Sequence, residues 1–169
     1  GADWRYVYDK RTGTFSEMIY HNQNLLEKPM EYNIWRAPTD NDRNIKKQWI
    51  RAGYDRTVSR AYETKIYCVG QKADGAGQEL NSAGQKLNGA GQMNEELPAG
   101  TVVLESRLSL SAVYLQRILN IQATWTIMPD GGIDVRLDVT RTPGFPFLPR
   151  FGLRLFLPKS MTAVTYCGI

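Results

Sequence analysis

Apolar side chains recur at every second position through much of the C-terminal half of this 169-residue chain. Residues 101–110 place valine or leucine on one parity except at Ser106, and residues 114–128 repeat the pattern. Residues 129–132, Pro-Asp-Gly-Gly, then interrupt it before residues 133–139 alternate again. Because neighbouring side chains of a strand point to opposite faces, this period predicts half-buried β-strands joined by tight turns.

The N-terminal half predicts the same kind of structure. Residues 4–8 and 15–20 alternate around an Asp-Lys-Arg-Thr-Gly turn at 9–13, which indicates a β-hairpin. A second polar turn is expected at residues 21–24. Residues 57–69 predict a long strand that is buried in part on both faces.

Near the C-terminus, residues 142–149 contain three prolines and are therefore excluded from a central strand. Residues 150–157 and 161–167 predict two further strands. About eight strands joined by hairpins, with one short helix and no alternation of strands and helices, predict an all-β antiparallel sandwich. We expect residues 1–169 to form one domain, truncated at its end.

The densest group of polar and rigid residues is Trp-Arg-Ala-Pro-Thr-Asp-Asn-Asp at residues 35–42, called the acid-rich corner below. Pro38 removes a backbone donor and fixes its own φ, so the chain enters the corner stiffly. The side chains of Asp40, Asn41 and Asp42 are of the type that caps backbone N–H groups. The corner therefore predicts the end of a strand, a rigid turn and a helix cap.

A short amphipathic helix is expected after the corner. Apolar residues recur three to four positions apart from Ile45 through Trp49, with Asp42 or Asn44 as the cap and Gly53 as the stop. Trp49 is expected to anchor this helix to the sheet.

Residues 70–97 have a different composition, with Gly-Gln recurring every seven residues in four copies. A coiled coil needs two apolar positions per heptad, and glycine opposes helix formation by about 1 kcal/mol per residue. We therefore interpret residues 70–100 as a flexible insertion between two strands rather than a binding element.

The remaining composition excludes several classes of function. The net charge is +4, but the basic residues are scattered, which disfavours a nucleic-acid interface. No apolar run is long enough to span a membrane. Cys68 and Cys167 are interpreted as two packed thiols, with a disulfide as the alternative, and His21 as a solvated side chain rather than a ligand or base. No metal-binding spacing is present.

The acid-rich corner resembles the Arg-Ala-Pro-x-Asp-Asn-Asp core of one known family, the large β-galactosidases of glycoside hydrolase family 2. The turn at residues 9–13 before the corner and the tryptophan-bearing segment 49–53 after it occur in the family's order. The resembling region is the C-terminal sandwich of these enzymes, often called the small chain. The resemblance covers residues 2–67 well, residues from 101 onward loosely, and residues 70–100 not at all.

The resemblance implies a supersandwich related to galactose mutarotases, which packs on a catalytic (β/α)8 barrel or large subunit. In the family, two glutamates of that barrel hydrolyse terminal β-D-galactosides with retention. No catalytic residue is therefore expected in this chain, and the Mg²⁺ and Na⁺ that the family uses would bind elsewhere. Asp40 and Asp42 lie two residues apart in a turn, so we expect them to cap the backbone and pair with Arg36 rather than act as a catalytic pair.

By position, the family's loop at the mouth of the active site falls at residues 43–46, which makes Arg43 and Asn44 candidate substrate-binding residues. Trp35, Arg36, Pro38, Asp40, Asn41 and Asp42 would hold that loop in place. Two alternatives remain open: a free-standing carbohydrate-binding module, in which exposed Trp or Tyr side chains stack on sugars, and a purely structural interaction sandwich. The compartment, cytoplasmic or periplasmic in a bacterium, also remains open.

Overall fold

The computed structural model describes residues 3–69, 97–113, 116–163 and 165. The strands in these ranges are β1 (Trp4–Asp9), β2 (Thr14–Tyr20), β3 (Gln23–Asn24), β4 (Lys28–Asn33), β5 (Thr57–Cys68), β6 (Val102–Ala112), β7 (Arg117–Ile127), β8 (Ile133–Arg141) and β9 (Gly152–Phe156). The helix α1 (Arg43–Arg51) lies between two single-turn 3-10 helices, η1 (Asp40–Asp42) and η2 (Tyr54–Arg56).

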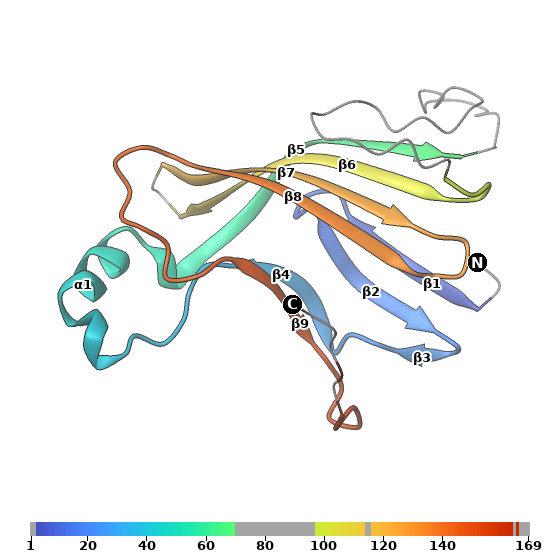
Figure 1. Cartoon of the computed structure of the whole chain (residues 1–169), viewed down its shortest axis with the longest axis horizontal. Coiled ribbons are helices and arrows are strands. Elements are labelled where there is room, and N and C mark those ends of the chain that lie inside the picture. Colours follow the sequence, from blue (N-terminus) through green and yellow to red (C-terminus); the bar gives the residue numbers. More distant parts are fainter. Residues whose placement is uncertain (1–2, 70–96, 114–115, 164, 166–169) are drawn as a thin grey trace.

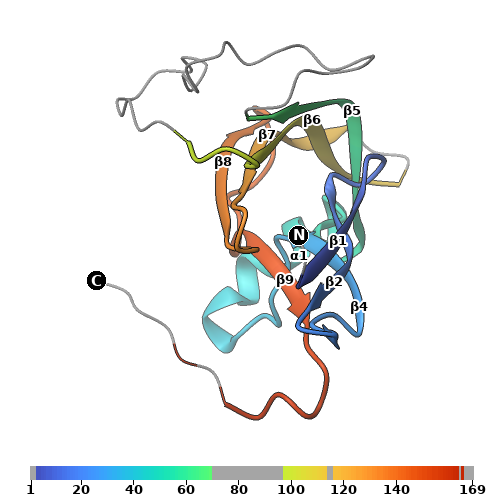
Figure 2. The same cartoon turned by 90° about the vertical axis from the view of Figure 1, so that its right-hand side faces the viewer.

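The strands form two layers. A four-stranded sheet in the order β5-β6-β7-β8 makes one layer, while a three-stranded sheet, β1-β2-β3, and a two-stranded sheet, β4-β9, make the other. Every strand pair is antiparallel. Figure 2 shows the four-stranded sheet arching over the second layer. The predicted all-β antiparallel sandwich with one short helix is confirmed.

The hydrophobic core fills the space between the layers. The inner face of β6 and β7 supplies Leu108, Leu110, Ile121 and Trp125, each 2% exposed or less. Phe15 of β2 meets the Trp125 ring edge-on, with 5.1 Å between ring centroids. Because these residues lie on alternate positions, the period of two in the sequence corresponds to the face that the sheet buries.

The turn between β1 and β2 is fastened to both layers at Gly13. The buried Tyr32 hydroxyl donates to the Gly13 carbonyl at 3.1 Å, and burial raises the pKa of this phenol. Nearby, the Ala61 amide of β5 donates to the Arg11 carbonyl at 2.7 Å. Gly13 has φ +74°, and a Cβ there would lie 2.6 Å from Leu108 Cδ2. Only glycine fits this backbone conformation and this close approach.

Several sequence-based expectations differ from the structure. The turn expected at 21–24 is confined to His21 and Asn22, both with left-handed φ, and Gln23–Asn24 forms β3. The strand expected at 161–167 is wrong where it is described, since residues 161–163 and 165 are not in a strand. These residues follow Pro158, and Met161 N donates to the Pro158 carbonyl in a turn.

The strand β5 is present at the edge of its sheet, and its burial is partial, as predicted. Ala61 is half-buried beside Leu108 on the inner face, and Tyr67, 5% exposed, lies on the outer face with Glu105. Cys68 at its end is exposed rather than packed. Cys167 and the repeat segment 70–96 lie outside the described residues.

We expect Gly13→Ala to destabilise the fold by about 2–4 kcal/mol, through left-handed backbone strain plus the clash with Leu108. The matched control is Gly144→Ala. Gly144 also has a left-handed φ, +88°, but no atom lies within 4 Å of a Cβ added there. That control should lose only about 1 kcal/mol, from backbone strain alone. Urea unfolding measures both losses, and equal losses would contradict the close approach at Gly13.

Candidate functional site

The acid-rich corner is closed by an ion pair between its first and last charged residues. Arg36 donates from both terminal nitrogens to the two carboxylate oxygens of Asp42, at 2.6 and 2.9 Å. The Asp42 side chain is 10% exposed and the Arg36 side chain 33%. This bidentate geometry fixes the position of both side chains, as one contact between two point charges would not.

The same carboxylate also ties the turn that follows Pro38. Asp42 Oδ2 accepts hydrogen bonds from the Thr39 amide at 2.8 Å and from the Thr39 hydroxyl at 3.0 Å. The hydrogen bonds from Arg36, followed by those from Thr39, lower the pKa of Asp42 to about 2. A general acid needs a raised pKa, so this carboxylate is suited to holding the corner and not to donating a proton.

Helix α1 starts from this corner. Asp42 occupies the N-cap position, as expected, but its carboxylate turns back to Thr39 and Arg36 and makes no side-chain cap bond to α1. The helix ends at Arg51, and Gly53 follows with φ +74°, as expected for a helix stop. The buried Trp49 is 0% exposed, and the Arg36 guanidinium lies over its ring at 5.5 Å from the centroid.

The corner and the helix together hold the proline-rich loop, residues 142–149. Its three prolines have no N–H groups, so much of its backbone cannot form its own ladder of hydrogen bonds. Instead, side-chain donors from elsewhere bind its carbonyl groups. These contacts are Arg36 Nε to Pro149 O at 3.3 Å, Trp49 Nε1 to Phe147 O at 2.9 Å, Tyr54 OH to Pro146 O at 2.7 Å, and Arg141 Nη1 to Phe145 O.

The sequence analysis identified Arg36 and Trp49 but missed that both donate hydrogen bonds to the proline-rich loop. Trp49 was expected to anchor the helix to the sheet, and its indole does lie in the core, but its N–H binds the proline-rich loop. Tyr54 and Arg141 were not singled out at all. The signal that points to them is indirect: a loop with three prolines has unpaired carbonyls, and nearby Arg, Trp and Tyr residues are the donors that can reach them.

The structure separates the remaining candidate residues into two groups. Pro38 is half-buried inside the turn, and Trp35 is half-buried against the core, where its carbonyl accepts a hydrogen bond from the Asn33 amide. Asp40 and Asn41 are exposed in η1, and Asp40 does not pair with Arg36, which corrects that part of the prediction. The reason is geometric: both guanidinium nitrogens that face the turn are occupied by Asp42.

Arg43 and Asn44 are the first two residues of α1, and both are exposed. They stand on a helix whose position is set by the ion pair behind it and by Trp49 beneath it.

The described residues also lack the donor set of a metal site. No group of three or more His, Cys, Asp or Glu side chains gathers there in a way that could hold an ion. Within the same ranges, no helix has the length and apolar character needed to cross a bilayer.

Comparison with known proteins gives a consistent result. The family model described as β-galactosidase small chain matches residues 1–169. The chain is 32% identical over 167 residues to a β-galactosidase of Actinobacillus pleuropneumoniae and 29% identical over 171 residues to one of Staphylococcus xylosus. Each match covers 99% of this chain but only 14% of the relative.

The fold and the corner thus define an antiparallel β-sandwich module with a rigid arginine–aspartate turn. The chain belongs to the β-galactosidase small-chain family. It spans about one seventh of the length of the curated relatives that it matches.

The low pKa of Asp42 predicts a specific pH dependence of stability. The folded-state pKa of about 2 lies below the ordinary value of 3.8. The carboxylate therefore makes its full contribution to the free energy of unfolding above pH ~4, and this contribution is lost as the pH falls toward 2. The difference in free energy of unfolding between the wild type and Asp42→Asn should therefore shrink over that window. Asp40→Asn, at an exposed position in the same corner, is the control and should show little difference at any pH. A constant difference for Asp42→Asn would contradict the charged hydrogen bonds.

Tyr54→Phe tests whether the hydrogen bond from Tyr54 to Pro146 O holds the proline-rich loop in place. The substitution removes only the hydroxyl that binds Pro146 O, from a side chain that is 0% exposed, and should cost about 1 kcal/mol of stability. Limited proteolysis should cut residues 142–149 faster in this variant. Tyr20→Phe, at a tyrosine that is 37% exposed, should change neither quantity. Unchanged cleavage in Tyr54→Phe would mean that the loop does not depend on this contact.

Proposed function

We propose that this chain is a non-catalytic sandwich module of a β-galactosidase that hydrolyses terminal β-D-galactosides. In this role it packs on the catalytic barrel or large subunit and shapes the mouth of the active site. The observation that carries the proposal is the match of the whole chain to the small-chain family at only 14% of each relative's length. A module of this size would act as part of a longer enzyme.

The distribution of exposed apolar side chains supports a packing role. Val135 of β8, Phe147 of the proline-rich loop and Leu155 of β9 are 44%, 60% and 48% exposed, and Leu157 just beyond β9 is 40% exposed. They come from adjoining parts of the chain, β8, β9 and their connection. Exposed apolar side chains of this kind are typical of surfaces that another part of a protein covers.

The acid-rich corner supports the proposed role at the active-site mouth. Arg43 and Asn44 project from the first turn of α1, which the Arg36–Asp42 pair and the buried Trp49 hold in a fixed position. Substrate-positioning residues need such rigid structural support, because small displacements weaken the alignment of the bound sugar. We assign to these two side chains contact with the galactoside or with the loops around it.

The assignment can be tested in a chimera, in which this chain replaces the matching segment of the Actinobacillus pleuropneumoniae β-galactosidase. The isolated chain should not cleave a chromogenic galactoside, whereas the chimera should. Arg43→Ala in the chimera should raise KM about three- to tenfold with a smaller change in kcat, as expected when a binding contact is lost.

The matched control is Lys47→Ala, an exposed basic residue one turn further along α1. It should leave KM unchanged. Turnover by the isolated chain that depends on Asp40 or Asp42 would overturn the non-catalytic assignment. An equal effect of Arg43→Ala and Lys47→Ala would overturn the role of Arg43.

A further inference from the structure

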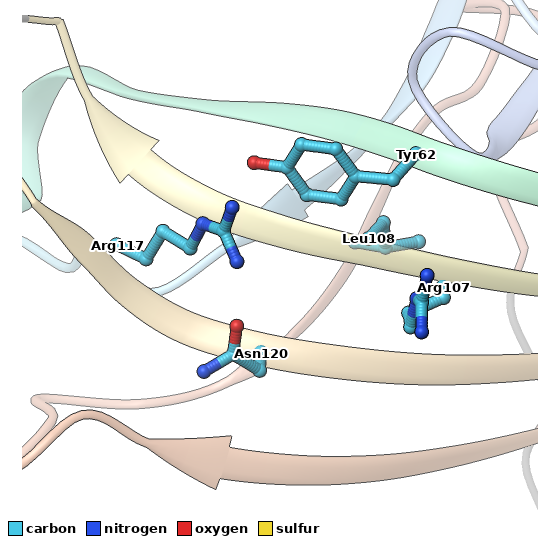
Figure 3. A pocket seen from close by; sticks show the side chains of 5 residues that line it. All are labelled: Tyr62, Arg107, Leu108, Arg117 and Asn120. Atoms are coloured by element: carbon cyan, nitrogen blue, oxygen red, sulfur yellow. The ribbon is translucent and has the colours of Figure 1, made fainter.

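A second polar surface lies on the outer face of the four-stranded sheet and uses none of the residues of the acid-rich corner. Here a depression of about 530 Å³ is lined by Tyr62, Arg107, Arg117 and Asn120, together with Leu108, a core residue that is only 1% exposed. Figure 3 shows these side chains, which come from β5, β6 and β7. We call it the arginine–tyrosine pocket. Its volume is in the range of small-molecule sites.

Two β-bulges build this pocket. In β5 the register shifts between Ala61 and Glu63, so that the consecutive residues Tyr62 and Glu63 both contact outer-face residues of β6. In β7 the register with β6 skips Ile118, which is 0% exposed. If residues 117–119 alternated regularly, without this register shift, Arg117 would lie on the inner face with Leu119. Bulges commonly re-aim side chains beside functional sites.

The pocket is held in place by contacts of the Tyr62 side chain. Its hydroxyl is 2.8 Å from Ser109 Oγ, which is buried in β6. The Arg117 guanidinium lies over the ring at 4.6 Å from the centroid, and that of Arg60 at 5.9 Å. These cation–π contacts orient the two arginines without neutralising their charge.

The pocket carries an excess of positive charge. Among the described residues, neither Arg60 nor Arg117 has a carboxylate within ion-pair distance, and Arg107 has only Glu63, at 3.5 Å. Glu63 is itself shared with Lys65, also at 3.5 Å. On the same face of the sheet, Arg136 of β8 is instead paired with Asp138 at 3.1 Å. The charge excess is therefore local to the pocket and not a property of the whole face.

We propose that the arginine–tyrosine pocket binds a small ligand carrying a carboxylate or phosphate group. The guanidinium groups of Arg117 and Arg107 bind the oxyanion, which suits their planar donor geometry. The Asn120 amide provides polar contacts for the rest of the ligand. The site is independent of the function proposed above, because it uses none of the corner residues.

Titration of the full chain followed by amide chemical shifts in NMR tests this proposal. The probes are inorganic phosphate, galacturonate and galactose 6-phosphate, with neutral galactose as the uncharged comparison. The charged probes should bind in the millimolar range, with shifts centred on Ser109 and Arg117. Binding should weaken as the ionic strength rises, because the pocket is open to solvent. Tighter binding of galacturonate or of galactose 6-phosphate identifies the carboxylate or the phosphate as the preferred group.

Two variants locate the binding. Arg117→Gln should weaken binding about tenfold or more, since a charged hydrogen-bonding partner is lost at an exposed position that the fold does not need. Arg136→Gln, on the same face but outside the pocket, should bind as the wild type does. Circular dichroism checks that both variants are folded.

Three results would overturn the proposal. The first is no shift with any charged probe at ~20 mM, and the second is an equal loss of binding in both variants. The third is binding of a glutamate-rich peptide at this face without binding of the small anions, which would make it a protein-docking surface instead.

Discussion

The Arg36 guanidinium connects the acid-rich corner, helix α1 and the proline-rich loop, three segments that lie outside the β-sheets. One side chain binds both oxygens of Asp42, lies over the Trp49 ring and donates to the carbonyl of Pro149. Residues 36, 42, 49 and 149 belong to a turn, a helix and a distant loop. Because the guanidinium is planar and has five donors, it can satisfy these partners at once, whereas lysine could not.

The contacts of Arg36 explain how the acid-rich corner keeps one conformation at the end of the sandwich. The β-sheets bury alternate residues and fix the two layers, while the proline-rich loop packs through Phe145 and Leu148 against the core. The proline-rich loop gains its order from donors on the corner, on α1 and on η2. A rigid end of this kind is consistent with the wall role proposed above, and Arg43 and Asn44 are exposed on it.

Much of the fold could be predicted from local patterns. The hairpin of β1 and β2, the long strands β6, β7 and β8, the short helix and the irregular proline-rich loop all follow from period, turn residues and capping residues. The errors have identifiable causes. Cys68 is exposed because β5 is an edge strand, and the bulge at Tyr62 changes which residues face outward. Neither edge position nor a bulge leaves a clear signal in the order of the residues.

The sequence by itself determined that this chain forms antiparallel strands with one short helix, and its corner motif pointed to the β-galactosidase small-chain family. These features depend on neighbouring residues, whose period and turn chemistry can be read directly. Only the tertiary structure decided that Asp42 and not Asp40 pairs with Arg36, that Trp49 and Tyr54 hold a loop some ninety residues away, and that Tyr62 and Arg117 meet on the outer face. Those contacts join residues far apart in the chain, and their geometry depends on how the layers pack and where the strands bulge.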